Sequence, residues 1–507
     1  MASYWRRMRG YMPLQQDNDE HYNERHEEIP MSTFPTQTRF SRRSLTSPSK
    51  VFQIIRHHLS IRRALALIFA ACFIMIAIVL SSGIPPRYDD IWAYEKVLPQ
   101  HNLTAATVDV RLGKRKYLRF EGGVKGRGLN NVLQEALMMS YVAYLTDRAF
   151  VFEDYVWSLN SPFWSTVDEW ALRPSRIPFN AFISGPTTGG PISTRGNAVE
   201  TRSVSLEFFD QVCPSSARTT VSAAESPSDR EGHDLVDWWV ERLGKVKDDP
   251  CVVVDSSKEV FDIDFFGSSK HIISAFDSLR TSPILKDFSW SPLVLSAIPR
   301  NFAVLHPPDL KDLYDQSQNS TIKGLVAIHL RRGDFFGHCL YLLKWRVLYM
   351  GMNTYSGIPD FFDPEGYLRH HSEAEEKELN DHEKSRILKP YYFEHCLPEV
   401  DQIVHRLRSV REENPSLDLN KVYVLSNGKA SWLNELAGAL KGDGWGDVKS
   451  TLDLRLDSQQ KYVSGAIDMA IAEKAEVFIG NGFSSLSSNI VMLRLAKGLP
   501  VTSNRLL

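Results

Sequence analysis

Residues 324–335 constrain the fold of this 507-residue chain more than any other stretch. Their first part, Gly324 to Leu330, is a short β-branched apolar run that predicts a buried strand. Polar residues and a turn-forming glycine mark its end: His329, Arg331, Arg332, Gly333 and Asp334. Open α/β sheets bind ligands where parallel strands end, and guanidinium groups bind phosphate oxygens in a bidentate manner. The stretch therefore predicts either a diphosphate-binding turn or a surface turn held by an internal Arg–Asp pair.

The length of the chain predicts two domains with appendages, because 507 residues exceed one ordinary domain. Its composition, 43% hydrophobic and 24% charged, is that of a globular protein. The formal net charge of −2 gives no electrostatic case for a nucleic-acid partner. Any anionic ligand must therefore be held by local positive charge.

An apolar run near the N-terminus predicts a membrane helix. Residues 64–80 are all apolar and the run continues to Ile84, which reaches the roughly 20 residues that cross a bilayer. Between residues 39 and 63, just before this run, there are seven basic residues and no acid: Arg39, Arg42, Arg43, Lys50, Arg56, Arg62 and Arg63. This flank predicts a disordered cytosolic tail over 1–63, a single transmembrane helix over 64–84, and a lumenal body, as in a type II membrane protein. A cleaved signal peptide and a buried core helix are the alternatives.

Cysteines and glycosylation triplets agree with a body in the Golgi or endoplasmic reticulum. Sequons begin at Asn102 and Asn319. Four cysteines follow the apolar run, an even number that suits two disulfides in an oxidising compartment: Cys213, Cys251, Cys339 and Cys396. Of the three possible connectivities, proximity in sequence favours Cys213–Cys251 and Cys339–Cys396. No CxxC or HxxxH spacing supports a zinc site.

The first half of the body predicts a β–loop–α–β unit. After a stem over 85–110, we place an N-terminal domain at 111–310, beginning with a strand at 116–120. A glycine-rich loop at 121–131 feeds a helix at 131–145, and another strand follows at 148–152. Helix N-termini attract anions, so the loop is a candidate anion site. The Asp-Ile-Asp triplet at 262–264 predicts a structural turn rather than a metal site, and we expect no metal.

The second half, residues 311–507, predicts a second α/β domain. Strands at 422–425 and 476–480 and helices at 400–413, 430–440 and 465–475 follow the strand at 324–330. Between them we expect a loop-rich aromatic insertion at 337–395. The last strand leads into a serine-rich loop, Asn481 to Ser488, and a helix at 489–497 with Ser487 or Ser488 as its N-cap. Such a loop is either a second phosphate cradle or a capped turn without a ligand.

Three motifs in this order resemble the GDP-fucose O-fucosyltransferase family and its α1,6-fucosyltransferase relatives. They are Gly126-Arg-Gly-Leu-Asn-Asn131, His329-Leu-Arg-Arg-Gly-Asp334 and Phe478-Ile-Gly-Asn-Gly-Phe-Ser-Ser-Leu-Ser487. The resemblance covers roughly residues 115–505. It implies an α/β, GT-B-like fold of two Rossmann-like domains that face a cleft. The donor nucleotide would bind the C-terminal domain, and transfer would be inverting and metal-independent.

Leaving-group chemistry assigns roles around the arginine turn. Displacing GDP builds negative charge on the β-phosphate, which a fixed guanidinium stabilises more in the transition state than in the ground state. We assign Arg331 this role, with Arg332 sharing the diphosphate or bracing the turn. His329 would donate to phosphate or ribose, and Asp334 would orient an arginine.

Further residues complete the predicted site. Ser484 and Ser485 would close around the diphosphate, and Asp468 would bind guanine or ribose. On the acceptor side, the family motif places Asn130 near the sugar and the acceptor hydroxyl. Arg127 reaches the phosphates or only the surface, and Glu121 is the nearest candidate general base.

The predicted function is fucose transfer from GDP-fucose to a hydroxyl of a protein or glycan. No cofactor other than this donor substrate is expected, and the partners are the nucleotide sugar, the acceptor and, through residues 64–84, a membrane. Two alternatives remain open from the sequence. One is the same fold with another nucleotide sugar, and the other is an inactive membrane-anchored lectin-like or scaffold protein.

Overall fold

The structure is a computed structural model of the chain. It describes residues 61–507 except 82–85, 123–126, 157–165, 169–170, 175, 229, 262, 268–270, 306–320, 334 and 372–378. The chain divides into two compact units, Met1–Ile84 and Pro85–Leu507. The second unit holds all the sheets and every predicted site residue.

The described part of the first unit is one helix, α3 (Ile61–Ser81), with exposed side chains such as Leu67, Phe69 and Phe73. A search of the described residues finds no helix long and apolar enough to cross a membrane. This finding contradicts the transmembrane helix predicted over 64–84. Residues 1–60 of the predicted cytosolic tail lie outside the described residues.

The N-terminal half of the second unit is built on a five-stranded parallel sheet. Its strand order is β8-β2-β1-β10-β9. The strands are β1 (Tyr117–Phe120), β2 (Ala149–Phe152), β8 (Val204–Ser205), β9 (Thr219–Val221) and β10 (Cys251–Val254). Three two-stranded antiparallel ribbons accompany it: β3 (Tyr155–Val156) with β6 (Arg176–Ile177), β4 (Thr166–Asp168) with β5 (Ala171–Arg173), and β7 (Ile183–Ser184) with β11 (Ser289–Trp290). The sheet is buried on both faces, as parallel sheets are.

The C-terminal half repeats this plan with a second five-stranded parallel sheet, in the order β14-β13-β12-β15-β16. The strands are β12 (Ile322–Leu330), β13 (Lys421–Ser426), β14 (Asp447–Ser450), β15 (Ala475–Gly480) and β16 (Asn504–Leu506). The chain runs from the central β12 outward through β13 and β14, then returns to β15 on the other side of β12. Ligands bind at such a switch in strand order, outside the carboxyl ends of the strands.

Helices cover the two sheets. Those of the N-terminal half are α4 (Asp89–Lys96), α5 (Leu103–Arg111), α6 (Leu129–Leu145), α7 (Leu206–Val212), α8 (Gly232–Gly244), α9 (Ile263–Phe266), α10 (His271–Thr281), α11 (Pro283–Lys286), α12 (Pro292–Leu295), α13 (Ala297–Arg300) and α14 (Phe302–Leu305). Those of the C-terminal half are α15 (Phe335–Lys344), α16 (Pro364–His371), α17 (Asp381–Cys396), α18 (Val400–Glu413), α19 (Ala430–Gly442), α20 (Ser464–Lys474) and α21 (Ser485–Ala496).

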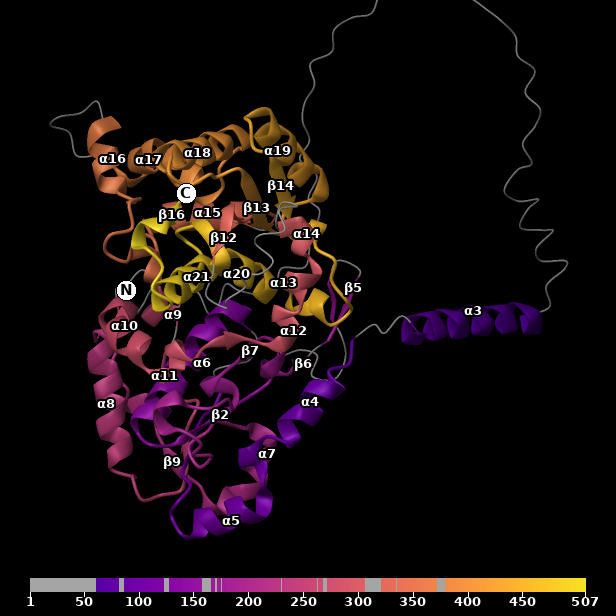
Figure 1. Cartoon of the computed structure of the whole chain (residues 1–507), viewed down its shortest axis with the longest axis vertical. Helices are drawn as coiled ribbons and strands as arrows, with labels where there is room; N and C mark the ends of the chain where they lie inside the picture. Colours follow the sequence, from indigo (N-terminus) through magenta and orange to yellow (C-terminus); the bar gives the residue numbers. More distant parts are fainter. Residues whose placement is uncertain are drawn as a thin grey trace, which may run out of the picture. The chain divides into compact units, whose positions relative to one another are not determined.

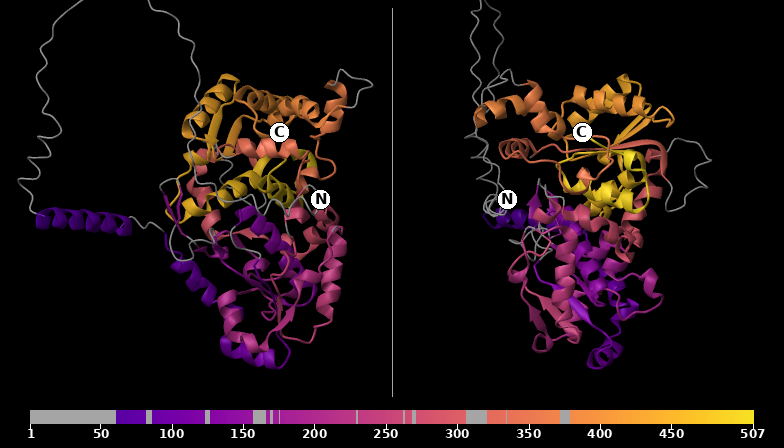
Figure 2. Two further views of the ribbon diagram at one scale, coloured as in Figure 1. Left: turned by 180° about the vertical axis from the view of Figure 1, so that it is seen from behind. Right: turned by 90° about the vertical axis from the view of Figure 1, so that its left-hand side faces the viewer.

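The two faces of the C-terminal sheet have different neighbours. One face packs against α18 and α19 through Ile403, Leu407 and Leu436. The other face packs against α20 and α21, whose apolar side chains belong to the same buried cluster as those of the N-terminal half. Helices α20 and α21 accordingly lie between the C-terminal sheet and the N-terminal half (Figure 1), and the further views show the same layering (Figure 2). The first turn of α21 can therefore contact both halves.

Both predicted disulfides are confirmed. Cys213 bonds to Cys251, which ties the end of α7 to the start of β10. Cys339 bonds to Cys396 and joins α15 to α17. The insertion at 337–395, predicted to be loop-rich, is instead largely helical. Its helices α15, α16 and α17 enclose a small core of their own.

The stem expected over 85–110 carries α4 and most of α5, and its described residues contact the N-terminal half. Tyr88 and Gln100 are both completely buried. Gln100 donates hydrogen bonds to the carbonyl oxygens of Gly189 and Ser203, at 2.9 and 2.8 Å. This segment is thus part of the folded body.

Candidate active site

The arginine turn at the end of β12 is held by its neighbouring strand. Gly333 has a φ of 63°, a left-handed conformation that favours glycine. Asn427, in the loop after β13, accepts from the backbone N–H of Arg332 at 2.8 Å and donates to its carbonyl at 3.1 Å. The two bonds fix the backbone from which both arginine side chains project.

The two guanidinium groups have different surroundings. That of Arg332 donates to the carbonyl of Pro398 and lies 4.1 Å from the ring centroid of Trp432. Burial lowers the pKa of Arg332, against a raising effect of Glu399. Arg331 is half-buried, and its guanidinium lies 5.1 Å from the ring centroid of Phe335. Arg332 is therefore anchored within the protein, whereas Arg331 is the better placed of the two to meet a ligand.

His329 and the third motif meet in a buried hydrogen-bond chain. Nδ1 of His329 lies 2.9 Å from Oγ of Ser487, which also accepts from the backbone N–H of Asn481 at 2.9 Å. Burial, and secondarily the charge of Arg331, lower the pKa of His329 to about 3, so the imidazole is neutral. The Ser487 hydroxyl oxygen already accepts from Asn481, so we assign the hydroxyl proton to the bond with Nδ1, which places the proton of His329 on Nε2. His329 can offer that N–H to an anionic oxygen.

The neutral state of His329 gives a prediction about stability. An unfolded chain binds a proton on this histidine near pH 6.5, whereas the folded protein does so only near pH 3. The free energy of unfolding should therefore fall as the pH decreases from 6.5 towards 3. Denaturant titrations at pH 7 and pH 4.5 should show that the free energy of unfolding falls less between these two pH values in His329→Gln than in the wild type. An equal loss of unfolding free energy in both proteins would contradict the neutral state of His329. Burial also lowers the pKa values of His101 and His395, but both residues are present in the two proteins and contribute equally to their losses.

Ser484 and Ser485 lie at the N-terminus of α21. The helix begins at Ser485 with Ser484 as N-cap residue, so the predicted N-cap at Ser487 or Ser488 is wrong. Those two hydroxyls serve other partners, since Ser487 contacts His329 and Ser488 accepts from the backbone N–H of Met352 at 3.0 Å. Ser484 and Ser485 are half-buried, and neither hydroxyl has a hydrogen bond within the described residues. They can bind an anion together with the first N–H groups of the helix.

Asn130 connects the first motif to the same turn of α21. The side-chain amide of Asn489 donates to the backbone carbonyl of Asn130 at 3.0 Å and to its Oδ1 at 3.3 Å. Asn489 is completely buried and follows Ser487 by two residues. One turn of α21 thus contacts the end of strand β12 through Ser487 and the start of α6 through Asn489.

The other N-terminal candidates are already in ion pairs. Glu121, just after β1, lies 3.3 Å from Nη1 of Arg119, whose Nε donates to Glu153 at 3.0 Å. Arg127 is paired with Glu135 and Glu259. The proposed roles of Glu121 as base and Arg127 as phosphate ligand stay predictions.

Asp468 on α20 is buried beneath the sheet. Its oxygens accept from the hydroxyls of Tyr423 at 2.6 Å and Thr451 at 2.9 Å. Burial raises its pKa to about 7, although these two hydrogen bonds act in the opposite direction. Both oxygens have protein donors, so contact with a nucleoside also stays a prediction.

Some predicted residues cannot be placed, and others were missed. Asp334 and Asn319 lie outside the described residues. Asn102 is exposed and caps α5 by accepting from the N–H of Ala105 at 3.0 Å. Sequence reasoning missed Asn427 and Asn489, and it assigned Ser487 only as a cap. The Asn-Gly pair after β13 was a signal for the first, whereas nothing in the sequence distinguishes the serines of the last loop.

Two parallel sheets, with arginine, histidine and serine side chains at the strand-order switch of the second, form an arrangement that suits the binding of a phosphate-bearing ligand. Residues 300–496 match the family model described as GDP-fucose protein O-fucosyltransferase, which includes the whole of β12 and the serine-rich loop. The matched residues contain the second and third motifs but not the first, and the match confirms the resemblance to this family and the prediction of an enzyme of the fucosyltransferase class. A comparison with curated proteins gave no match.

Several solved fucosyltransferase structures are similar to this chain. POFUT1 in complex with GDP-fucose has 17% identity and a TM-score of 0.42, covering 77% of this chain and 97% of POFUT1. An Arabidopsis thaliana FUT1 variant in complex with GDP has 9% identity and a TM-score of 0.36, covering 81% and 77%. NodZ α-1,6-fucosyltransferase soaked with GDP-fucose has 11% identity and a TM-score of 0.34, covering 74% and 93%.

Proposed function

We propose that this protein transfers fucose from GDP-fucose to a hydroxyl acceptor by inverting, metal-independent chemistry. The observation that carries the proposal is the contact of one helical turn with two of the motifs. Ser487 of α21 bonds to His329, and Asn489 of the same turn bonds to Asn130. Residues far apart in the sequence thereby meet at the carboxyl ends of β12 and β15. The family match supplies the donor class.

The C-terminal half has the groups that a leaving GDP requires. When the bond between the sugar and the β-phosphate breaks, negative charge grows on the phosphate oxygens. Arg331, the N–H at Nε2 of His329 and the N-terminus of α21 would then face that charge as fixed donors. Fixed donors stabilise a developing charge without having to reorganise during the reaction. Ser484 and Ser485 would add hydroxyl donors to the same phosphates.

The N-terminal half would present the acceptor. Asn130 is held against α21 and so lies beside the proposed phosphate site, where its amide can orient an acceptor hydroxyl. Glu121 follows the central strand β1 and would take the hydroxyl proton once the acceptor displaces Arg119 from it. A second carboxylate, Glu153, would keep Arg119 in place during that exchange.

We also propose that the body works in the secretory pathway. Two disulfides suit an oxidising compartment, and Asn102 of the first sequon is exposed. Whether the acceptor is a protein Ser/Thr or a glycan follows from the assay below, since both supply a hydroxyl.

Transfer assays test this function. The purified protein is incubated with GDP-fucose, GDP-mannose or UDP-sugars, with glycan and protein acceptors, in the presence of a chelator. We expect sugar transfer from GDP-fucose alone, undiminished by the chelator, and a product whose anomeric configuration is opposite to that of the donor. Transfer from another donor would support the same fold with a different sugar. A folded protein whose melting temperature no nucleotide raises would instead be an inactive scaffold.

A further inference from the structure

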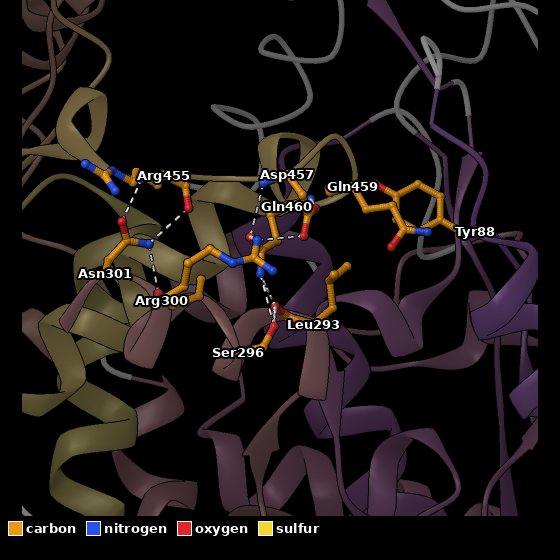
Figure 3. Close-up of polar contacts among 10 residues, drawn as sticks. Tyr88, Leu293, Ser296, Arg300, Asn301, Arg455, Asp457, Gln459 and Gln460 are labelled. Carbon is orange, nitrogen blue, oxygen red and sulfur yellow. Dashed lines mark hydrogen bonds and ion pairs between the residues drawn. The ribbon is translucent and has the colours of Figure 1, made fainter. Parts of the chain in front are cut away.

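Residues 455–460 form a short segment of the C-terminal half that binds the N-terminal half at two places; we refer to it as the clasp segment. It follows the 3₁₀ turn η9 (Thr451–Asp453), and its last residue, Gln460, begins the 3₁₀ turn η10 (Gln460–Val463), which leads into α20. Figure 3 shows its polar contacts, which come from residues far apart in the sequence. It is separate from the contact between Asn130 and Asn489.

The first binding place is the region of α12 and α13. Gln460, which is completely buried, donates to the carbonyl of Leu293 at 3.0 Å and to the hydroxyl of Ser296 at 3.1 Å. Nη1 of Arg300 donates to Oε1 of Gln460 at 2.5 Å and to Asp457 at 2.8 Å (Figure 3). Burial opposes ionisation of Asp457, but the hydrogen bonds from Arg300 and Gln460 outweigh it and lower the pKa. The Gln460 amide therefore has partners for both its oxygen and its nitrogen.

Asn301 adds a backbone pairing next to this network. Its amide donates to the carbonyl of Arg455 at 3.2 Å, and its Oδ1 accepts from the N–H of Arg455 at 2.6 Å. Asn301 is itself almost fully buried. The Asn301 side chain thus hydrogen-bonds to both the N–H and the carbonyl of Arg455. This pairing fixes the position of the clasp segment along the N-terminal half.

Helix α12 is in turn fixed to the N-terminal half. Ser291, its completely buried N-cap residue, donates to the carbonyl of Ala181 at 2.6 Å, and its N–H donates to Phe182 at 3.1 Å. The strand just before it, β11, pairs with β7. The contacts of Gln460 therefore reach an element that is anchored in the other half.

The second binding place is the start of α4. The side chain of Gln459 donates to the carbonyl of Arg87 at 2.6 Å and to Asp90 at 3.0 Å, while the hydroxyl of Tyr88 donates back to the carbonyl of Gln459 at 3.1 Å. Helix α4 also bonds to the N-terminal half, since Nε1 of Trp92 donates to Asp154 at 3.3 Å. Gln459 therefore binds the start of α4, whereas its neighbour Gln460 binds the region of α12.

We propose that the clasp segment sets the spacing between donor and acceptor, with Gln460 and Arg300 as positioning residues. The inference rests on the proposed function, in which the donor groups belong to the C-terminal half and Asn130 and Glu121 belong to the N-terminal half. Buried polar groups lose their partners at high cost, so the clasp holds the halves in one arrangement throughout the reaction. A displacement near 1 Å between reacting groups can lower a rate on the order of 100-fold.

Gln460→Ala tests the proposal, and Gln100→Ala is its matched control. Both glutamines are completely buried and each donates two hydrogen bonds, but those of Gln100 stay within the N-terminal half. We expect both variants to lose stability, and only Gln460→Ala to lose kcat/KM for the acceptor by at least about 10-fold. The Kd of GDP, measured by calorimetry, should stay within about twofold of the wild type in both, because the GDP contacts under the proposed function (Arg331, His329, Ser484 and Ser485) lie in the C-terminal half.

Two outcomes would overturn the proposal. One is turnover in Gln460→Ala no lower than in Gln100→Ala, and the other is GDP affinity that falls in parallel with turnover. If Gln460→Ala does not fold, Arg300→Ala takes its place, because this residue is at the surface. Arg408→Ala is then the control, since Arg408 pairs with Asp443 inside the C-terminal half. If the folded wild-type protein binds no GDP, the proposed function itself is refuted. That result differs from the two outcomes above, which compare variants with their controls.

Discussion

Arg331→Ala is expected to lower kcat on the order of 10²–10³-fold, by analogy with removal of one oxyanion-hole donor. The guanidinium of Arg331 is half-buried at the carboxyl end of β12, beside the neutral His329 and the N-terminus of α21. Truncation removes the one full positive charge among these three donors, so the growing phosphate charge loses its strongest partner. Release of GDP from GDP-fucose, followed with and without acceptor, measures the effect. Folding should be nearly unaffected.

Arg332→Ala is the matched control, one residue away. The Arg332 side chain stacks on Trp432 and donates to the carbonyl of Pro398, so its removal should lower stability. Melting temperatures should therefore separate the two variants: Arg332→Ala melts lower, and Arg331→Ala melts close to the wild type. Arg331→Lys should recover part of the rate, because the charge remains and the bidentate geometry is lost. Unchanged turnover in Arg331→Ala would refute the role of this arginine as phosphate clamp.

Replacing both Cys339 and Cys396 by alanine should cost about 4 kcal/mol of the free energy of unfolding. The two residues are 57 positions apart, and the loop-entropy relation gives about that value for a loop of this length. The replacement should also weaken GDP binding, because the disulfide lies next to residues that hold the site. The carbonyl of Cys396 accepts from the side chain of Asn481 at 2.8 Å, and Pro398 bonds to Arg332. Denaturant titration and GDP calorimetry measure the two effects.

The other disulfide supplies the control. Cys213 and Cys251 are 38 positions apart, so their replacement should cost a similar free energy. They join α7 to β10 in the N-terminal half, away from the proposed GDP contacts, and GDP affinity should stay unchanged. Equal weakening of GDP binding in both variants would show that the Cys339–Cys396 link has no special connection to the site. Cys72→Ala, which changes an exposed free cysteine on α3, should alter neither property.

The sheet strands around the site follow closely from the sequence. The run at 324–330 and the runs at 422–425 and 476–480 are strands because continuous apolar, β-branched segments suit a sheet that is buried on both faces. The cysteine pairs were also correct, because short separations place their partners on neighbouring elements. The order of strands around β12, which brings Arg331 and Ser484 to the same edge, required the structure.

Other features were beyond the sequence patterns used. The N-cap of the last helix was predicted at Ser487 or Ser488, but tertiary partners engage both hydroxyls and the helix begins earlier, with Ser484 as its N-cap residue. The aromatic insertion is helical, and α17 carries a capping box of Asn380 and Glu383 that could have indicated it. The membrane helix, predicted from a long apolar run and its basic N-terminal flank, is not found among the helices of the described residues. Partners such as Asn489 are visible only once α6 and α21 are side by side.

Calorimetric titration of GDP and GMP into the wild-type protein tests the central claim most directly. The account places Arg331, His329, Ser484 and Ser485 around a diphosphate, so the β-phosphate should contribute much of the affinity. We expect GDP to bind at least about 10-fold more tightly than GMP, and Arg331→Ala to remove most of that difference, since one charge-assisted bond contributes on the order of 1.5–3 kcal/mol. Equal affinity for GDP and GMP, or no binding of either by the folded protein, would contradict a diphosphate site at the end of β12.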